Sequence, residues 1–352
     1  MSEPPPTAVP IVRARSAREW EALGVACPSC HAPLDDAVGP ALRCTGCGRE
    51  YPVTLGIPDL RLLGDPYLST AEDVTAATTL AGRDDGRSFG ELYASYYEGN
   101  AKVPPEQVAR FTHGVLAAAD RAQATLQTWK ELDAPMPTTG TLLDLGCGTA
   151  PLGVALACSG YSVVGVDAGL RWLVLARKRA AEQGIDLPVV CANAEHLPLR
   201  AASCTAVVGE SVLENVADAD AVVRESRRVL GPRGVLALTT PNRHSVGPDP
   251  HLGLLAGGWR SNATLQAHAL RSGQVMPRRR LFTPAELTRT LRHGGFEDVR
   301  LSLPQFAGAQ VSGLAAPLRL AIGAYHLIRR IPLVRSIVLQ IAPAISVVAR
   351  ST

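Results

Sequence analysis

Two glycines flanked by aspartates are the residues of this 352-residue chain whose types and spacing best suit chemistry. The run LLDLGCGTA at 142–150 passes from apolar residues into glycines, and Asp167 ends a second apolar run. Glycines in such a turn can adopt positive φ and let a ligand lie against bare backbone. An acid about 20 residues further on can accept hydrogen bonds from a ribose. The spacing therefore predicts a pocket for an adenosine-containing cofactor.

One proline argues against a dinucleotide in this pocket. A dinucleotide would need a third glycine at position 151 to seat its pyrophosphate at a helix N-terminus. Pro151 stands there instead and suits the first turn of a helix. Asp144 would repel a pyrophosphate, whereas it can attract the amino group of a methionine moiety. These residues together predict S-adenosylmethionine as the cofactor.

From Thr141 to Asn242 the chain resembles the class I methyltransferases of the UbiE and type 11 kind. LLDLGCGTA matches the first motif of that family, VVGVDAG at 163–169 the second, and CANAEHLPL at 191–199 its adenine-binding turn. Ala168 replaces the usual serine. Asn193 replaces the usual aspartate, although an asparagine carbonyl can still accept from the adenine amino group. The resemblance implies an α/β fold with a Rossmann-like, seven-stranded, mostly parallel sheet.

The motifs and the resemblance together predict a set of cofactor-binding residues and three candidate bases. Methyl transfer is an in-line displacement, so the protein aligns the acceptor and, for an oxygen or nitrogen acceptor, removes its proton. Glu210 follows the fourth expected strand, and His244 and His251 follow the fifth, where loops leave the carboxyl ends of the strands. The predicted cofactor contacts are Asp144, Gly146, Cys147, Gly148, Asp167, Ala168, Asn193, Ala194 and Glu210.

Two C-x-x-C pairs near the N-terminus predict a zinc site. The pair Cys27 and Cys30 is separated from the pair Cys44 and Cys47 by residues 31–43. Four thiolates at this spacing suit tetrahedral zinc, and a segment of about forty residues has too small a core to fold without such a staple. The segment resembles the Trm112-like zinc ribbons. We therefore expect a small N-terminal zinc ribbon over 21–63 with the four cysteines as structural ligands.

Composition predicts the organisation around the ribbon. Residues 1–20 are Pro-rich and polar and predict a disordered tail, whereas 64–88, rich in Thr, Asp, Gly and Ala, predict a linker. Residues 89–139 predict a helical lead-in, in which Tyr96 and Tyr97 either contact the sulfonium or pack in a core. The cysteine usage and the polar N-terminus predict a cytoplasmic protein.

The charge of the chain is polarised toward its C-terminal third. We expect the cofactor-binding core over 140–243, a substrate insertion over 244–282, and the C-terminal part of the same domain with basic helices over 283–352. From His251 to Thr352 there are thirteen arginines, no lysine and three acids, an excess of +10. Such an excess predicts an anionic partner, either nucleic acid or phosphate-bearing lipid.

Residues 314–330 predict a basic amphipathic helix. Leu318, Ile322 and Tyr325 would share one face and Arg319 another. Few aromatic residues accompany these arginines, although base stacking in an RNA enzyme would require them. Peripheral contact with an anionic membrane is therefore favoured over RNA.

Three functions remain open from the sequence. The first is S-adenosylmethionine-dependent methylation of a small molecule, natural product, glycan or lipid-linked precursor. The second is methylation of a base in rRNA or tRNA. The third is a non-catalytic scaffold that binds the cofactor without using it.

Overall fold

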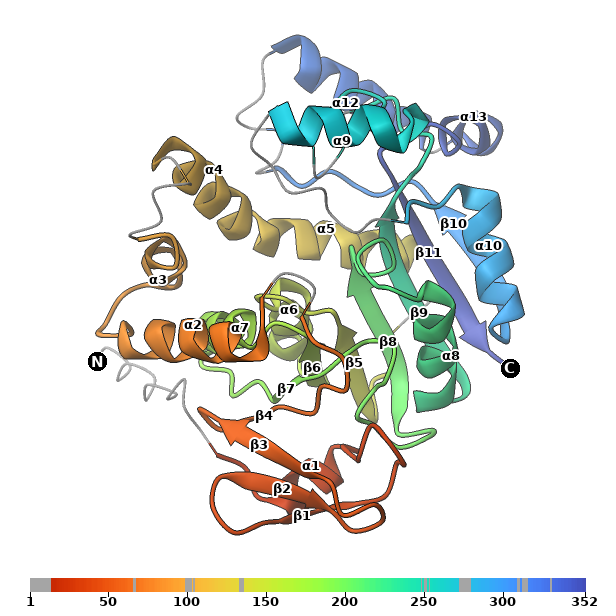
Figure 1. Ribbon diagram of the computed structural model, residues 1–352. Coiled ribbons are helices and arrows are strands. Elements are labelled where there is room, and N and C mark those ends of the chain that lie inside the picture. The colour runs from red at the N-terminus through yellow and green to blue at the C-terminus, as the bar shows by residue number, and fades with distance from the viewer. Residues whose placement is uncertain are drawn as a thin grey trace, which may run out of the picture.

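Seven strands form one mixed sheet in the computed structural model, in the order β10-β11-β9-β8-β5-β6-β7 (Figure 1). β11 is antiparallel to both of its neighbours, and the remaining pairs are parallel. The expected seven-stranded, mostly parallel sheet is confirmed. In sheet order the strands are Phe296–Ser302, Ala344–Ser351, Leu230–Pro241, Cys204–Glu210, Thr141–Leu145, Ser162–Asp167 and Val189–Cys191. The structure describes residues 14–65, 68–98, 103, 105–132, 136–247, 249, 252, 254–271, 280–308, 311, 316–329 and 331–352.

Helices cover both faces of the large sheet, so its central strands are apolar on both sides. Consecutive strand residues enter different hydrophobic clusters: Leu142 joins the cluster that contains side chains of α6 and α7, and Leu143 the cluster that contains side chains of α8 and α10. These helices are Pro151–Cys158, Leu170–Ala181, Ala219–Val229 and Pro284–His293. Both residues are fully buried. The apolar run before the glycines thus forms the centre of the core.

The N-terminal ribbon is a small antiparallel sheet with one short helix. Its strands β1 to β4 lie in sequence order and span Leu34–Asp36, Ala41–Cys44, Glu50–Thr54 and Ile57–Pro58. The helix α1 (Ala17–Ala22) contacts β1. Its Trp20 is fully buried in the same hydrophobic cluster as Tyr51 and Leu60.

The expected disordered tail over 1–20 is wrong for its last residues, because α1 begins there. The Ser16 side chain accepts a hydrogen bond from the Glu19 amide, and the Glu19 carboxylate accepts one from the Ser16 amide. This capping box stabilises the first turn of the helix. Arg15 forms an ion pair of 2.6 Å with Asp186 of the core. Residues 1–13 lie outside the described part of the chain.

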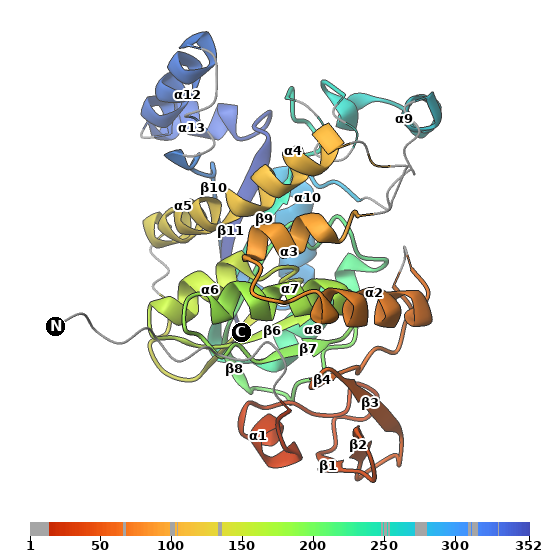
Figure 2. The same ribbon diagram turned by 90° about the vertical axis from the view of Figure 1, so that its left-hand side faces the viewer.

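The ribbon is joined to the free side of β7. Asp59 forms a parallel bridge with Cys191, and the Leu60 amide donates to the Cys191 carbonyl at 2.7 Å. An antiparallel bridge joins Val25 to Leu199. Side chains of the ribbon and of the large sheet also share one hydrophobic cluster. Ribbon and core are therefore one packed body, with the ribbon at one end (Figures 1 and 2).

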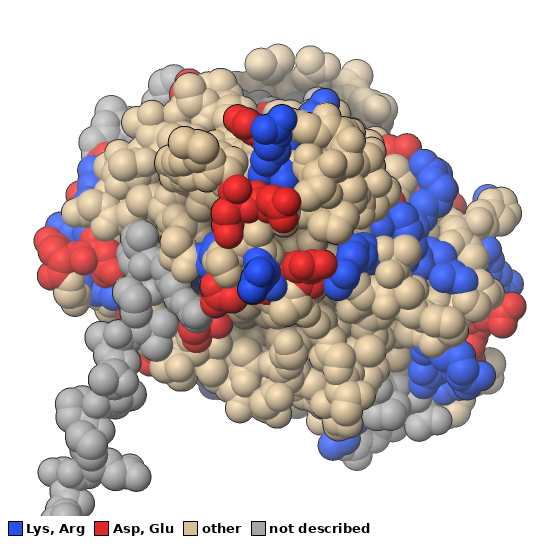
Figure 3. All heavy atoms as spheres, turned by 90° about the horizontal axis from the view of Figure 1, so that it is seen from below, with Lys and Arg blue, Asp and Glu red and all other residues tan. Residues whose placement is uncertain are grey.

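The outer face of the ribbon carries charges of both signs. Residues 21–63 include three arginines and five acids. Viewed from the ribbon end, Asp and Glu lie close to Lys and Arg, with broad uncharged areas between them (Figure 3). This face is therefore not uniformly basic.

The linker prediction for 64–88 is wrong for most of its length, because α2 (Thr70–Gly82) occupies it. Ser69 and Glu72 form a capping box at its start. The buried residues Asp73, Ala77 and Leu80 recur at helical spacing, and α2 packs against α7. Threonine, alanine and aspartate suggested a loop by composition, but tertiary packing of one face selects the helix.

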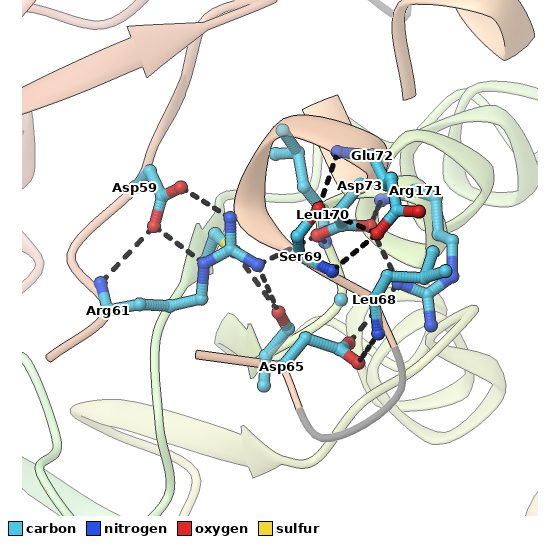
Figure 4. A network of polar contacts seen from close by, with 12 residues as sticks. Asp59, Arg61, Asp65, Leu68, Ser69, Glu72, Asp73, Leu170 and Arg171 are labelled. Atoms are coloured by element: carbon cyan, nitrogen blue, oxygen red, sulfur yellow. Dashed lines mark hydrogen bonds and ion pairs between the residues drawn. The ribbon is translucent and has the colours of Figure 1, made fainter. Parts of the chain in front are cut away.

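Asp73 connects α2, α7 and the segment that leaves the ribbon (Figure 4). Its carboxylate accepts hydrogen bonds from the amides of Leu170, at 2.8 Å, and Arg171, at 3.3 Å, so it caps the N-terminus of α7. The same carboxylate lies 2.7 Å from the Arg171 guanidinium and 2.8 Å from that of Arg61. The network therefore ties three segments together across more than a hundred residues of sequence.

Two more acids complete this network. Asp59 pairs with Arg61 at 2.5 Å, and Asp65 pairs with Arg171 at 3.2 Å. All of these side chains are at most 7% exposed. Burial alone would raise the pKa of Asp73, but the hydrogen bonds from Arg171 and Leu170 hold that pKa below its usual value. Asp73 is therefore ionised at neutral pH and balances two buried cations.

Three helices lie within the expected lead-in. They are α3 (Phe89–Ser95), α4 (Pro105–Leu116) and α5 (Ala118–Glu131), of which α5 packs on α6 and β11. The described part of the expected insertion over 244–282 contains the 3-10 turn η1 (Gly257–Trp259) and the helix α9 (Asn262–Arg271).

The helices α9, α12 (Ala316–Ile328) and α13 (Pro332–Val338) form the end of the molecule opposite the ribbon (Figures 1 and 2). Within the described ranges, none of the helices has the length and apolar character that crossing a membrane requires.

Part of the apolar face expected for 314–330 packs against protein. Tyr325 donates a hydrogen bond to the Pro304 carbonyl at 2.8 Å, and its ring lies 5.1 Å from that of Phe306. Ile322 is half-buried with it, and the side chain of Leu318 lies outside the described part. The helix buries its aromatic residue because the loop after β10 offers an apolar surface to cover.

We expect Asp73→Ala to lower the free energy of unfolding by about 3 to 5 kcal/mol, because two buried guanidiniums lose their shared partner. Chemical denaturation at neutral pH measures this change. Since the pKa of Asp73 is lowered in the folded state, its stabilisation is present above the unfolded pKa of about 3.9 and is lost as the pH falls through the folded value.

The matched control for this prediction is Asp85→Ala. Asp85 is 66% exposed and pairs with Arg87 at 3.4 Å, so its removal is expected to cost less than about 1 kcal/mol. Equal effects of the two substitutions would show that the buried network does not stabilise the fold.

Candidate functional site

The glycine turn lies between β5 and α6 and has the backbone that was predicted. Gly146 has φ +60° and Gly148 φ +52°. A side chain at Gly146 would place its Cβ 2.8 Å from a methyl group of Val212, so the turn needs glycine for space as well as for conformation. Pro151 is the first residue of α6. The turn therefore leaves open backbone at the carboxyl ends of the parallel strands, where this fold class binds its ligands.

A first cavity of about 350 Å³, here called the adenosine cavity, lies beside this turn. Its wall includes Gly146 and Gly148, and residues from the ends of β6 and β7 complete it. The sequence predictions that line it are Gly146, Gly148, Asp167, Ala168, Asn193 and Ala194. The structure thus brings together six of the nine predicted cofactor contacts in this one cavity.

Asp167 is positioned by backbone amides. Its two carboxylate oxygens accept hydrogen bonds from Gly148 and Gly169, each at 2.8 Å. Burial raises the pKa of Asp167, and these two hydrogen bonds oppose the rise. Each oxygen keeps a lone pair that can accept from a ribose hydroxyl.

Asn193 has a different role from the one that the sequence suggested. Its side-chain carbonyl already accepts hydrogen bonds from the amides of Leu62, at 3.0 Å, and Leu63, at 2.8 Å. This carbonyl was expected to accept from the adenine amino group. The side chain instead fixes the segment that leaves the ribbon, and its own amide group is the part that can donate to an adenine nitrogen.

The segment that leaves the ribbon forms one wall of the adenosine cavity. Leu63, Gly64 and Asp65 line it, together with Arg171 and Trp172 at the start of α7. These residues were not predicted from the sequence. No sequence motif relates them to the glycine turn, because long-range contacts with Asp73 and Asn193 hold them at the cavity.

A second cavity of about 630 Å³, here called the acceptor cavity, meets the first at Gly146 and Ser211. The three remaining predicted contacts, Asp144, Cys147 and Glu210, line it. All nine predicted cofactor residues therefore line one or the other of two cavities that share Gly146 and Ser211 in their walls.

The inner end of the acceptor cavity suits a cation. The Asp144 carboxylate accepts a hydrogen bond from the Gly153 amide at 2.8 Å, and Glu210 accepts one from Thr125. Burial, together with the negative charges of Glu210 and Asp167, raises the pKa of Asp144 to about 8. An ammonium group placed here would relieve the repulsion between these acids, as the methionine end of the expected cofactor would.

The three candidate bases differ in their position relative to the acceptor cavity. Glu210 lines the acceptor cavity. His244 stacks on Trp259, with ring centroids 4.4 Å apart, and is not among the residues that line this cavity. His251 lies outside the described part of the chain.

Of the lead-in aromatics, Tyr93 lines the acceptor cavity, and Tyr96 and Tyr97 pack behind it. Tyr93 stacks on Trp172 at 6.1 Å, and its hydroxyl lies 3.2 Å from that of Tyr97. Core packing is therefore the role of Tyr96 and Tyr97 in this structure.

The four ribbon cysteines lie close enough to share one metal ion. All four sulfur atoms are within 4.8 Å of one another, with Cys27 and Cys47 at 3.8 Å and Cys30 and Cys44 at 3.4 Å. A tetrahedron with zinc–sulfur bonds of about 2.3 Å has edges of about 3.8 Å, so the cluster fits zinc with all four positions filled by protein. Such a closed site is structural.

Two family models match the chain. A methyltransferase domain matches residues 143–238, and a Trm112p-like protein matches residues 25–56. The first match includes the glycine turn and central strands of the large sheet. The second match includes the four cysteines of the ribbon.

Curated relatives and solved structures are similar to parts of this chain. The ubiquinone biosynthesis O-methyltransferase of Cereibacter sphaeroides is 35% identical over 116 residues, which are 33% of this chain and 47% of that protein. The enzyme of the same name from Sinorhizobium fredii is 30% identical over 170 residues, 48% of this chain and 67% of that protein. A methyltransferase structure from Thermotoga maritima is 18% identical, with a TM-score of 0.45, and the match covers 70% of this chain and 97% of that one.

The chain thus spans from about half to two thirds of the length of these two curated relatives. The matched methyltransferase domain, residues 143–238, includes the glycine turn, Asp167 and Glu210. The chain belongs to the class I S-adenosylmethionine-dependent methyltransferases and carries an N-terminal Trm112-like zinc ribbon.

Proposed function

We propose that this protein transfers a methyl group from S-adenosylmethionine to a small molecule. The observation that carries the proposal is the meeting of two cavities at Gly146 and Ser211. The adenosine cavity would hold the nucleoside, and Asp144 would hold the ammonium group at the inner end of the acceptor cavity. The reactive carbon would then face the rest of the acceptor cavity. The acceptor cavity beside the cofactor residues, with Glu210 in its wall, favours an enzyme over a scaffold.

When bound, the cofactor supplies an electrophilic methyl group, so the protein has to align the acceptor and remove its proton. Glu210 is the candidate base that reaches the acceptor cavity, and Thr125 orients its carboxylate. The apolar walls of the cavity exclude water from the acceptor. Tyr93, Phe111 and Phe306 provide much of that apolar wall.

The surface of the ribbon favours a small acceptor over RNA. A ribbon that holds RNA would need a basic face to bind phosphates. Residues 21–63 instead carry two more acids than arginines, and the outer face mixes both signs (Figure 3). A cavity of 630 Å³ is also in the usual range for small-molecule sites.

The end of the molecule opposite the ribbon suggests that the acceptor is lipid-linked. Large apolar side chains are exposed on α12 and α13, among them Leu320 at 79%, Leu327 at 64% and Leu333 at 75%. Arg319 and Arg335 accompany them, and residues 303–352 contain no acid. Apolar side chains among cations suit the surface of an anionic membrane. Because Tyr325 of α12 packs on Phe306, which lines the acceptor cavity, such a membrane would lie near that cavity.

We expect label from the methyl group of S-adenosylmethionine to enter the small-molecule or lipid pool of a cell extract. Asp167→Ala should lower this transfer about 10- to 100-fold at low cofactor concentration, because loss of a charged acceptor for the ribose costs about 1.5 to 3 kcal/mol of binding. Calorimetry with S-adenosylhomocysteine measures that loss directly, and Asp85→Ala is the control. Label in the RNA pool would contradict the proposed acceptor, and unchanged binding in the variant would contradict the assigned site.

We expect zinc removal to weaken cofactor binding as well as the ribbon, because Leu63 to Asp65 line the adenosine cavity and are fixed by contacts of the ribbon. Metal analysis should find one zinc ion per chain, and Cys44→Ser should lower both zinc content and affinity for S-adenosylhomocysteine. Cys158→Ser is the control, since Cys158 is exposed and distant in sequence from the ribbon. Full cofactor affinity in a zinc-free protein would refute this coupling.

We expect the protein to sediment with anionic liposomes more than with neutral ones at low salt. Arg319→Glu with Arg335→Glu should abolish the preference for anionic lipid, and Leu320→Ser with Leu327→Ser should lower binding to both kinds of vesicle. Val38→Ser is the apolar control, because Val38 is fully exposed at the opposite end, on the ribbon. Sedimentation that is indifferent to lipid charge would contradict the membrane proposal.

A further inference from the structure

Two arginines line the outer part of the acceptor cavity. Arg110 comes from α4 and Arg121 from α5, and the cavity wall between them includes Gly114 and Val115. Among the described residues, neither guanidinium has a hydrogen bond or an ion pair to an acid, and Arg110 lies over the Phe111 ring at 5.8 Å. Within the described ranges, both guanidiniums therefore keep donors for a ligand.

A third arginine, Arg179, is buried nearby and differs from these two in its contacts. Arg179 donates to the carbonyls of Thr149, at 2.9 Å, and Val115, at 2.8 Å, so its donors are used. Burial and the positive charge of Arg121 lower the pKa of Arg179 to about 10, and the negative charge of Glu182 opposes this change. Arg121 is therefore close enough to Arg179 for their charges to repel each other.

The acids of the acceptor cavity lie at its other end. Asp144 and Glu210 line it on the side of the glycine turn, Asp144 as the partner of the cofactor's ammonium group and Glu210 as the candidate base. Thr125 donates to Glu210, and Arg121 precedes Thr125 by four residues on the same helix. One turn of an α-helix rises about 5.4 Å, which is roughly the width of a six-membered ring with its substituents.

The space between the two ends is apolar and aromatic. Tyr93, Phe111 and Phe306 line it together with Pro304 and Leu152. A planar, apolar body fits such walls, and the arginines would bind a charged substituent at its outer end. Guanidinium groups bind carboxylate and phosphate through paired hydrogen bonds, so either anion satisfies them.

We propose that Arg110 and Arg121 form an anion subsite that selects methyl acceptors carrying a carboxylate or phosphate about one ring away from the methylated atom. This inference rests on the proposed methyltransferase function and adds the charge of the acceptor to it. The arginines act in binding and orientation, and Glu210 keeps its place at the reacting atom.

Fluorine NMR titrations of the full-length protein saturated with S-adenosylhomocysteine test the subsite. The probes are para-fluorobenzoate, para-fluorophenyl phosphate and the uncharged para-fluorobenzamide. We expect Arg121→Gln to weaken binding of the two anions about tenfold and to leave the amide unchanged, because a hydrogen bond between charged groups is lost. Arg110→Gln should act in the same direction, and Arg121→Lys should restore part of the affinity. Arg224→Gln, on the exposed face of α8, is the control.

The outcomes separate this inference from the proposed function. Tighter binding of benzoate than of phenyl phosphate, or the reverse, would identify the preferred anion. Equal binding of anions and amide, or anion binding that persists without both arginines, would overturn the subsite while S-adenosylhomocysteine still binds. Failure of the unsubstituted protein to bind S-adenosylhomocysteine would instead overturn the proposed function.

Discussion

The carboxylate of Asp73 is the contact on which the geometry of the cofactor region depends. It is fully buried, and it satisfies the first amides of α7 while it balances Arg61 and Arg171. A buried charge of this kind is tolerated when its partners are held in place, so the network fixes where α7 begins and where the ribbon's exit segment runs. Both define walls of the adenosine cavity. The ribbon thereby becomes part of the cofactor site.

Short-range patterns made much of this site predictable. The glycine turn, Asp167 and the four cysteines are encoded by spacing within a few tens of residues, and the structure places each of them where the pattern requires. The chain order of strands and helices in the core likewise follows from apolar runs that alternate with helical patterns. A resemblance to known motifs supplied the expectation of a seven-stranded, mostly parallel sheet, whereas the strand order and the antiparallel β11 were not predicted.

Long-range contacts could not be predicted in the same way. The role of Asn193 depends on amides some 130 residues earlier in the chain, and Asp73 meets α7 nearly 100 residues later. The composition of 64–88 is typical of a linker. The helix α2 within it buries Asp73 on its packed face, so it has few large apolar residues that would indicate a helix. Tyr93, and not Tyr96 or Tyr97, lines the acceptor cavity, and the spacing of the tyrosines alone does not distinguish them.

The bridge between Asp59 and Cys191 has a consequence for solubility. A parallel sheet of this kind ends in a strand with unpaired backbone groups, and such an edge is a template for strands of other molecules. Here β7 is three residues long, and the backbone of the ribbon's exit segment pairs with its free side. The metal-stapled ribbon thus protects the sheet from intermolecular pairing, so a chain that loses its zinc would expose an aggregation-prone edge next to its cofactor site.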